Sequence, residues 1–200
     1  MRAIDDATRA LVRVAAVVAA GTEQAIRDEV GSAHGRAPAT WMEELLVQSY
    51  LFAGFPRALN AMREWRRYEP QVALSLESSD AAARQSDGVA TCSAVYGSMY
   101  ERLRRNIRAL HPLLDEWMIT EGYGKVLSRS ALDLGRRELC VVAACAASGQ
   151  DRQLHSHLHG AVNVGVAPAA IDQALETLTD ILGADRARAV GLLWARVKGK

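Results

Sequence analysis

The two halves of the chain carry the same pattern of residues, which limits the fold more than any other feature of the sequence. The segment that begins at Asp5 returns 128 positions later, at Asp133. The matches at this spacing are Asp5/Asp133, Arg9/Arg137, Leu11/Leu139, Val14/Val142, Ala15/Ala143, Ala16/Ala144, Ala19/Ala147 and Gly21/Gly149. After a short shift they resume at Pro38/Pro168, Leu45/Leu175, Gly54/Gly183, Arg57/Arg186, Ala58/Ala187 and Trp65/Trp194. Such self-similarity predicts two similar units that pack together.

The differences between the two halves are as informative as the matches. Glu138 occupies the position of Ala10, and His157 occupies the position of Glu29. A residue needed only for folding would be expected in both halves. The second half therefore retains an ionisable pair that the first half lacks, and these two residues are candidates for function.

Composition narrows the classes of protein. Two hundred residues, half of them apolar, suffice for one globular core or for two small units that share one. The formal net charge of +1 gives no reason to expect nucleic acid or a membrane as a partner. The apolar run at Val14–Ala20 is too short to span a bilayer. Three cysteines without disulfide spacing (Cys92, Cys140 and Cys145) favour a reducing, cytoplasmic setting.

Residue usage predicts an all-α fold, because Ala, Leu, Arg and Glu dominate and no alternating β-branched runs occur. Helices are expected at about 6–20, 23–34, 38–52 and 56–67, and again at 134–148, 151–164, 168–182 and 185–198. Two further helices, at about 91–110 and 112–120, should pack on the second unit. The turn Gly122-Tyr123-Gly124 is expected to end the last of these.

The resulting organisation is one compact domain with two pseudo-repeated helical units and extra helices between them. Residues 1–70 form a degenerate first repeat, 71–90 a linker, and 91–200 the second repeat with its preceding helices and the candidate site. Within the linker, residues 74–88 are polar and weakly patterned, which predicts a mobile segment.

Helical periodicity places Glu138 and His157 on inward faces. Glu138 shares one face with Val141, Val142 and Cys145, and His157 lies inside the apolar stripe of the next helix. Only two or three residues join the two helices, so they should run antiparallel and face each other. A carboxylate beside an imidazole can pass protons near neutral pH, as general acid–base catalysis requires. The alternative is a structural hydrogen bond between the helices.

Other polar residues give weaker signals. His155 and His159 are four residues apart, a spacing that can bind zinc. No third ligand at a suitable spacing supports a metal site, and the alternative is a solvated helix face. Cys140 and Cys145 do not form a Cys-x-x-Cys pair, so redox chemistry is not expected.

Arginines near the start of the helix at 134–148 could hold an anion. Arg136 and Arg137 flank Glu138, and Arg129 lies just upstream. The planar fork of arginine suits carboxylate binding, with ordinary surface charge as the alternative.

These residues resemble the carboxymuconolactone decarboxylase family. The resemblance rests on Leu132–Leu139, with its Arg-Glu-Leu helix start, and on Gln153–Val166, which carries Ser-His-x-x-x-Ala-x-x-x-Gly. It is strong over about 129–185, and a degenerate copy covers about 5–67. It implies the all-helical alkyl hydroperoxidase D-like fold and a homo-oligomer, with a trimer favoured and a hexamer as the alternative. Gln150 and Gln153 replace the two cysteines of the Cys-x-x-Cys motif of the peroxidase members. Peroxidase activity is therefore not expected.

The resemblance also implies a reaction. Its glutamate and histidine correspond to Glu138 and His157, the expected catalytic residues, and Arg136, Arg129 and Tyr123 are the expected substrate-binding residues. The implied activity is cofactor-free decarboxylation, or a related proton transfer, on a small carboxylated lactone of aromatic catabolism, with no cofactor and no metal. The alternatives are a non-catalytic oligomeric scaffold of the same fold and, third, a peroxide-linked redox protein.

Overall fold

The computed structural model describes residues 4–72 and 80–199. Every regular element in these ranges is helical, which confirms the all-α prediction. None of the helices described is long and apolar enough to cross a membrane.

Five helices of the first half and five of the second follow in the same order. The first set comprises α1 (Asp6–Ala20), α2 (Glu23–Ala33), α3 (Ala39–Gln48), α4 (Tyr50–Ala53) and α5 (Phe55–Trp65). The second set comprises α9 (Leu134–Ser148), α10 (Asp151–Asn163), α11 (Pro168–Glu176), α12 (Thr179–Leu182) and α13 (Ala184–Lys198). The single helices predicted at 38–52 and 168–182 are each divided in two. In the first set, the division falls at Ser49, whose hydroxyl donates to the Leu45 carbonyl.

The two sets begin and end their helices by the same devices. Asp5 caps α1 through Thr8 N, and Asp133 caps α9 through Arg136 N. Gly54 and Gly183 precede α5 and α13 with positive φ angles of 80° and 73°. These likenesses support the predicted repeat, which stays a prediction.

A matched pair of arginines adds to this likeness. Arg57 of α5 donates to the Val17 carbonyl near the end of α1, and Arg186 of α13 donates to the Ala146 carbonyl near the end of α9. Each guanidinium therefore satisfies carbonyls that the C-terminal turn of a helix leaves without partners.

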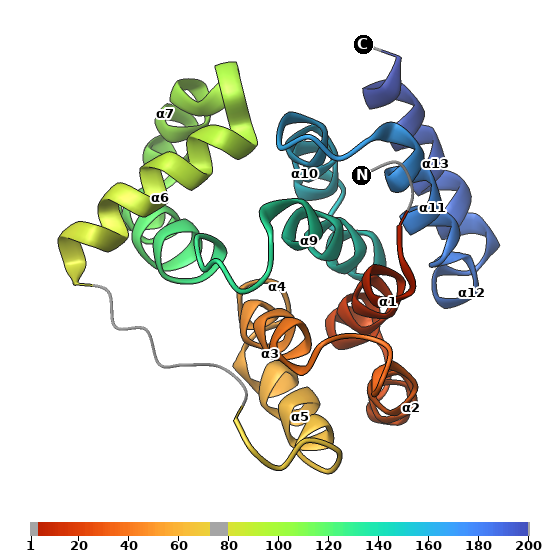
Figure 1. Ribbon diagram of the computed structural model, residues 1–200. Coiled ribbons are helices and arrows are strands. Elements are labelled where there is room, and N and C mark those ends of the chain that lie inside the picture. Colours follow the sequence, from red (N-terminus) through yellow and green to blue (C-terminus); the bar gives the residue numbers. More distant parts are fainter. Residues whose placement is uncertain (1–3, 73–79, 200) are drawn as a thin grey trace.

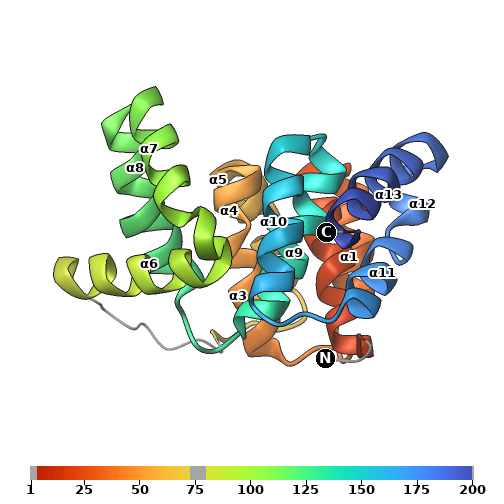
Figure 2. The same ribbon diagram turned by 90° about the horizontal axis from the view of Figure 1, so that it is seen from above.

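The core lies between the central helices of the two sets. Helices α1 and α9 run side by side in the middle of the molecule (Figure 1). Their buried residues belong to one apolar cluster that extends from Ile4 to Val197. In Figure 2, α11, α12 and α13 lie on one side of this centre and the helices between the two sets on the other.

The helices between the sets differ from the prediction. They are α6 (Ala81–Tyr96), the 3-10 turn η1 (Gly97–Met99), α7 (Tyr100–Leu110), α8 (Pro112–Trp117) and the π-helix η2 (Met118–Leu127). Of the predicted linker 71–90, residues 81–90 are helical, because Asp80 caps α6 through Ala83 N. Residues 73–79 of that linker, which include 74–79 of the predicted mobile segment, lie outside the described residues, whereas residues 81–88 of that segment are helical. As predicted, α6 packs against α10.

Glycines explain two further corrections. Gly97, at φ 53°, divides the helix predicted at 91–110. The Gly122-Tyr123-Gly124 segment does not end a helix but continues as η2. A Cβ on Gly124 would lie 1.9 Å from the Arg84 carbonyl oxygen, and a Cβ on Gly88 would lie 2.1 Å from the Ile119 carbonyl oxygen. The two glycines therefore let α6 and η2 pack backbone to backbone.

Candidate active site

The α9–α10 hairpin brings the two candidate residues together. Gly149 ends α9 in the left-handed conformation, and Asp151 begins α10 two residues later. The helices therefore run antiparallel in contact, as their short connection predicted. Because Glu138 lies on the inner face of α9 and His157 on that of α10, their side chains meet.

The predicted contact is a hydrogen bond between His157 Nδ1 and Glu138 Oε2, 2.8 Å apart. A carboxylate only accepts, so Nδ1 carries the hydrogen and Nε2 is the nitrogen left for a ligand. Glu138 is fully buried, and His157 is 5% exposed. The pair thus lies in the protein interior.

The second carboxylate oxygen of Glu138 has no partner. Oε1 is buried and forms no hydrogen bond. An unsatisfied buried acceptor costs about 1–3 kcal/mol, and more when it is charged. A hydrogen-bond donor that entered the site, from a ligand or from water, would remove this cost.

Small and aromatic residues shape the space around the pair. Gly160 is one turn beyond His157, and a Cβ there would lie 2.6 Å from Glu138 Oε2 and 2.7 Å from Val95 Cγ1. The rings of Phe52 and Tyr96 lie edge-on to the His157 ring, with centroids 5.9 and 6.3 Å away. His157 is therefore enclosed by residues of α4 and α6 as well as α9.

The same enclosure suppresses ionisation of neighbouring groups. Burial, and then the charge of Glu138, raises the pKa of the Cys145 thiol to about 12. Burial is also the main cause that raises the pKa of Tyr96 to about 12 and of Cys92 to about 12. Thiolates are therefore scarce near neutral pH, which argues against these cysteines as nucleophiles.

The predicted substrate-binding residues differ in their distance from the buried pair and in their partners. Tyr123 is buried beside Tyr96, with ring centroids 6.2 Å apart. Arg136, near the start of α9, bonds Asp5 at 2.8 Å and lies over the Trp41 ring.

Arg129 is held by a buried acid. Its Nε lies 3.0 Å from Glu44 Oε1. Both arginine charges are thus balanced within the chain, so this geometry does not favour Arg136 or Arg129 as an anchor for a substrate carboxylate.

Sequence reasoning missed a buried polar network beside the site. Arg137 was expected to bind an anion or to lie on the surface, but it is fully buried. Its NH2 lies 2.7 Å from Glu44 Oε2, its NH1 donates to Gln48, and its Nε donates to the Leu132 carbonyl. The only signal was that Glu44 and Gln48 are four apart among apolar residues of α3. The network fixes the start of α9, from which Glu138 projects.

The described residues do not favour a metal site. The rings of His155 and His159 meet edge to face with centroids 4.8 Å apart. Within 4–72 and 80–199, no group of three or more His, Cys, Asp or Glu side chains could hold an ion. The three cysteines are free and buried.

Comparison with known proteins agrees with the resemblance seen in the sequence. Residues 112–196 match the model of the Carboxymuconolactone decarboxylase family. Peroxisomal protein 2 of Schizosaccharomyces pombe is 28% identical over 145 residues, which cover 70% of this chain and 68% of that protein. Residues 112–196 contain α9 and α10 with both Glu138 and His157. Residues 112–196, somewhat less than half of the chain, are therefore similar to the carboxymuconolactone decarboxylase family.

Proposed function

We propose that the chain is a cofactor-free enzyme in which Glu138 and His157 transfer a proton to a small carboxylated lactone as it loses carbon dioxide. The match of residues 112–196 to the family model and the buried hydrogen bond between the two side chains support this proposal. The observation that carries it is the unpartnered Oε1 of Glu138. A pair kept only for stability would be expected to satisfy both oxygens.

The reaction needs few groups. Breaking the bond to the carboxylate carbon releases carbon dioxide and leaves an electron pair, which spreads into the conjugated lactone carbonyl. Nε2 of the His157 imidazolium then gives its proton to the ring carbon, and the carbonyl is restored. Glu138, bonded to Nδ1, orients the imidazole and stabilises its charged form, as the acid of a catalytic triad does. Solvent returns the proton to His157.

A structural role for the pair is the second candidate, and the near-complete burial of both side chains favours it. In that case the chain would be a scaffold with the same fold. The two candidates predict opposite effects of conservative variants. An active-site pair is needed for turnover, whereas a structural pair is needed for stability.

The test is turnover of a panel of carboxylated lactones in D2O. The wild-type protein should release carbon dioxide and place one deuterium on the product ring. His157→Gln should abolish both while the helix content and the midpoint of thermal unfolding stay near wild type. His34→Gln, a histidine of the first set, is the matched control and should turn over normally. Absence of carbon dioxide from the whole panel, or full activity of His157→Gln, would contradict the proposal.

We also propose a homo-oligomer, with a trimer favoured and a hexamer as the alternative. Large apolar side chains at the α7–α8 corner support it, because Leu110, Leu113, Leu114 and Trp117 are each at least 42% exposed. Light scattering on the purified protein measures the subunit number.

For location we propose the cytoplasm, since free thiols suit a reducing compartment. The name of the yeast relative makes the peroxisome the alternative.

A further inference from the structure

A groove separates α7 from α10, and the backbone explains why it exists. Asn163 at the end of α10 donates to the Val95 carbonyl of α6 at 2.8 Å, which holds these two helices together. Gly97, two residues beyond Val95, then adopts a positive φ and redirects the chain into α7. The space between α7 and α10 is a cavity of about 470 Å3. That volume is within the range of sites for small molecules.

The walls of this groove, which we call the α7–α10 groove, differ on the two sides. Tyr96, Met99 and Leu103 supply apolar surface from α6, η1 and α7. The ionisable side chains, apart from the Tyr96 phenol, are Arg102 of α7 and His155 and His159 of α10. The lining holds no carboxylate. A guanidinium and two imidazoles beside an apolar wall suit a small ring compound that bears a carboxylate.

A second cavity makes the contrast clear. It has a volume of about 370 Å3 and is lined by the charged residues Asp6, Arg9, Arg13, Glu29 and Arg36. In that cavity the carboxylates of Asp6 and Glu29 offset the positive charges of the arginines, so a bound anion would be attracted less strongly. Among the described cavities of this size, the α7–α10 groove is therefore better suited to an anion.

Tyr96 connects the α7–α10 groove to the buried pair. Its ring lines the groove and lies edge-on to His157, with centroids 6.3 Å apart and planes at 64°. Ser156, the neighbour of His157 in sequence, also lines the groove. The Tyr96 ring thus separates a ligand in the groove from the imidazole, and this ring must turn aside before His157 Nε2 can reach the ligand.

We propose that the α7–α10 groove binds the carboxylated substrate, with Arg102 and His155 holding its carboxylate and Tyr96, Met99 and Leu103 contacting its ring. The ligand class rests on the proposed function. The site replaces Arg136 and Arg129 as the anchors, because both of these arginines bond acids of the chain.

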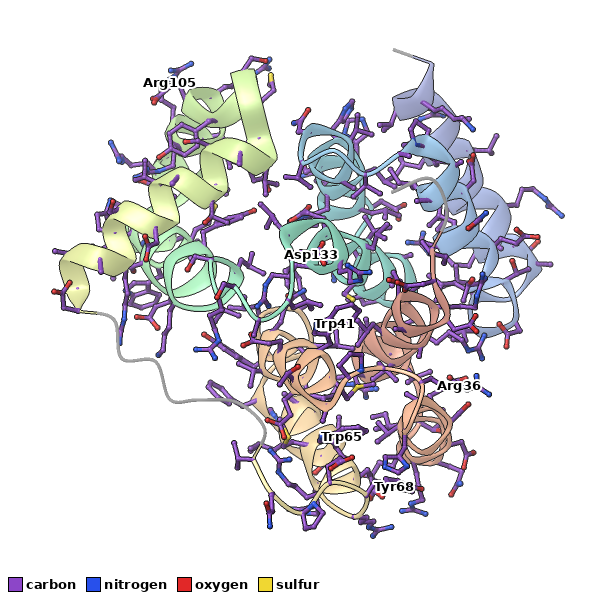
Figure 3. All side chains as sticks on the ribbon, viewed as in Figure 1. Arg36, Trp41, Trp65, Tyr68, Arg105 and Asp133 are labelled. Atoms are coloured by element: carbon purple, nitrogen blue, oxygen red, sulfur yellow. The ribbon has the colours of Figure 1, made fainter. Side chains whose placement is uncertain are left out.

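Binding is tested apart from turnover with a saturated carboxylated γ-lactone, which cannot delocalise the charge left by loss of carbon dioxide. Calorimetry on the full chain should show binding to the wild type. Arg102→Gln should weaken it about tenfold or more, since a charge-assisted hydrogen bond to the ligand is lost. Arg105→Gln is the control. Figure 3 shows Arg105 on the outer side of α7, away from α10, so the dissociation constant should change less than about twofold.

Two further measurements locate the ligand. Met99→Asp places a negative charge in the groove on a residue that is 48% exposed, and it should abolish binding while the protein stays folded. In NMR spectra the ring signals of His155 and His159 should shift on addition of the lactone, whereas those of His34 should not.

The outcomes separate the two proposals. Binding that Arg102→Gln and Met99→Asp leave unchanged, or absence of binding, would overturn the groove proposal even if the enzyme releases carbon dioxide. Binding in the groove without turnover of any lactone of the panel would overturn the proposed reaction and leave the groove as a carboxylate site.

Discussion

The α1–α2 hairpin and the α9–α10 hairpin each carry one hydrogen-bonded pair with a carboxylate between their helices, but the two pairs differ in chemistry. In the first hairpin, Arg13 Nε lies 3.0 Å from Glu29 Oε1, and its NH1 lies 2.8 Å from Asp180. In the second hairpin, Glu138 meets His157. Glu29 and His157 are 128 positions apart, the spacing at which the two halves match, so the predicted repeat would place a carboxylate in one hairpin where the other has an imidazole.

The two pairs also differ in how well they are satisfied. Arg13 donates to Glu29, to Asp180 and to the Thr177 carbonyl, and its side chain is 26% exposed. Those bonds raise the pKa of Arg13 further above its already high value. The Glu138 carboxylate is fully buried, and Oε1 has no partner. A pair with all its hydrogen bonds satisfied holds helices together. An unsatisfied, titratable pair can still accept a ligand.

The largest expected effect is that of Glu138→Gln on turnover. The variant keeps the shape of the side chain and removes the charge that stabilises the His157 imidazolium. The turnover number should fall roughly 10²–10⁴-fold, the usual contribution of general acid–base catalysis. The free energy of unfolding should change by about 1 kcal/mol or less, because a buried charge is removed together with its interaction. Steady-state kinetics and urea denaturation measure the two quantities, and loss of folding would assign the pair a structural role.

Gly160→Ala should disturb the same site sterically. The new methyl group would lie 2.6 Å from Glu138 Oε2, so the carboxylate or α6 must move. Overpacking of this kind costs about 1–3 kcal/mol, and turnover should fall with it. Urea denaturation and the lactone assay record both losses.

Gly191→Ala is the matched control for that variant. Gly191 is also within a helix, but nothing lies within 4 Å of the position of its Cβ. This variant should gain about 0.5–1 kcal/mol from the better helix propensity of alanine. Equal effects of the two substitutions would show that the space beside Glu138 is not needed.

The limits of α1 and α9 were predictable because local signals set them. Asp5 and Asp133 cap helices, and Gly149 ends α9 in the left-handed conformation. The division at Gly97 and the continuation of η2 were not predictable. Both depend on contacts between segments that are distant in sequence, such as Gly124 against Arg84. Local propensity carries no information about such packing.

The candidate site was likewise predictable in part. Periodicity alone placed Glu138 and His157 on facing surfaces, since two adjacent helices with a short connection leave little choice. The burial of Arg137 was missed because its acid, Glu44, is 93 residues earlier in the chain. The enclosing rings of Phe52 and Tyr96 also come from other helices.

In the first hairpin, Arg13→Gln should affect stability and leave turnover unchanged, the reverse of Glu138→Gln. Glu29 and Asp180 would lose a shared partner that is only partly exposed, so the free energy of unfolding should fall by about 1 kcal/mol. Arg188→Gln is the control, because its partner Asp185 is 99% exposed and the pair should contribute almost nothing. If Arg13→Gln lowered turnover at unchanged stability, the contrast between the hairpins would be lost.

The smallest expected effect is a pH dependence of the Arg13 network. The hydrogen bond from Arg13 lowers the pKa of Asp180 below its ordinary value of 3.8. An acid whose pKa is lower in the folded state stabilises the fold above its ordinary pKa, and this contribution disappears as the pH falls through the lowered pKa. At pH 7, Asp180→Asn should therefore be less stable than wild type by a few tenths of a kcal/mol, a small difference because Asp180 is 66% exposed. Urea denaturation from pH 7 to below 3 should show this difference constant down to about pH 5 and then vanishing, whereas Asp185→Asn should show none. A difference that persisted in acid would mean that the Asp180 carboxylate does not contribute through its charge, and that the first hairpin is held by Arg13 and Glu29 alone.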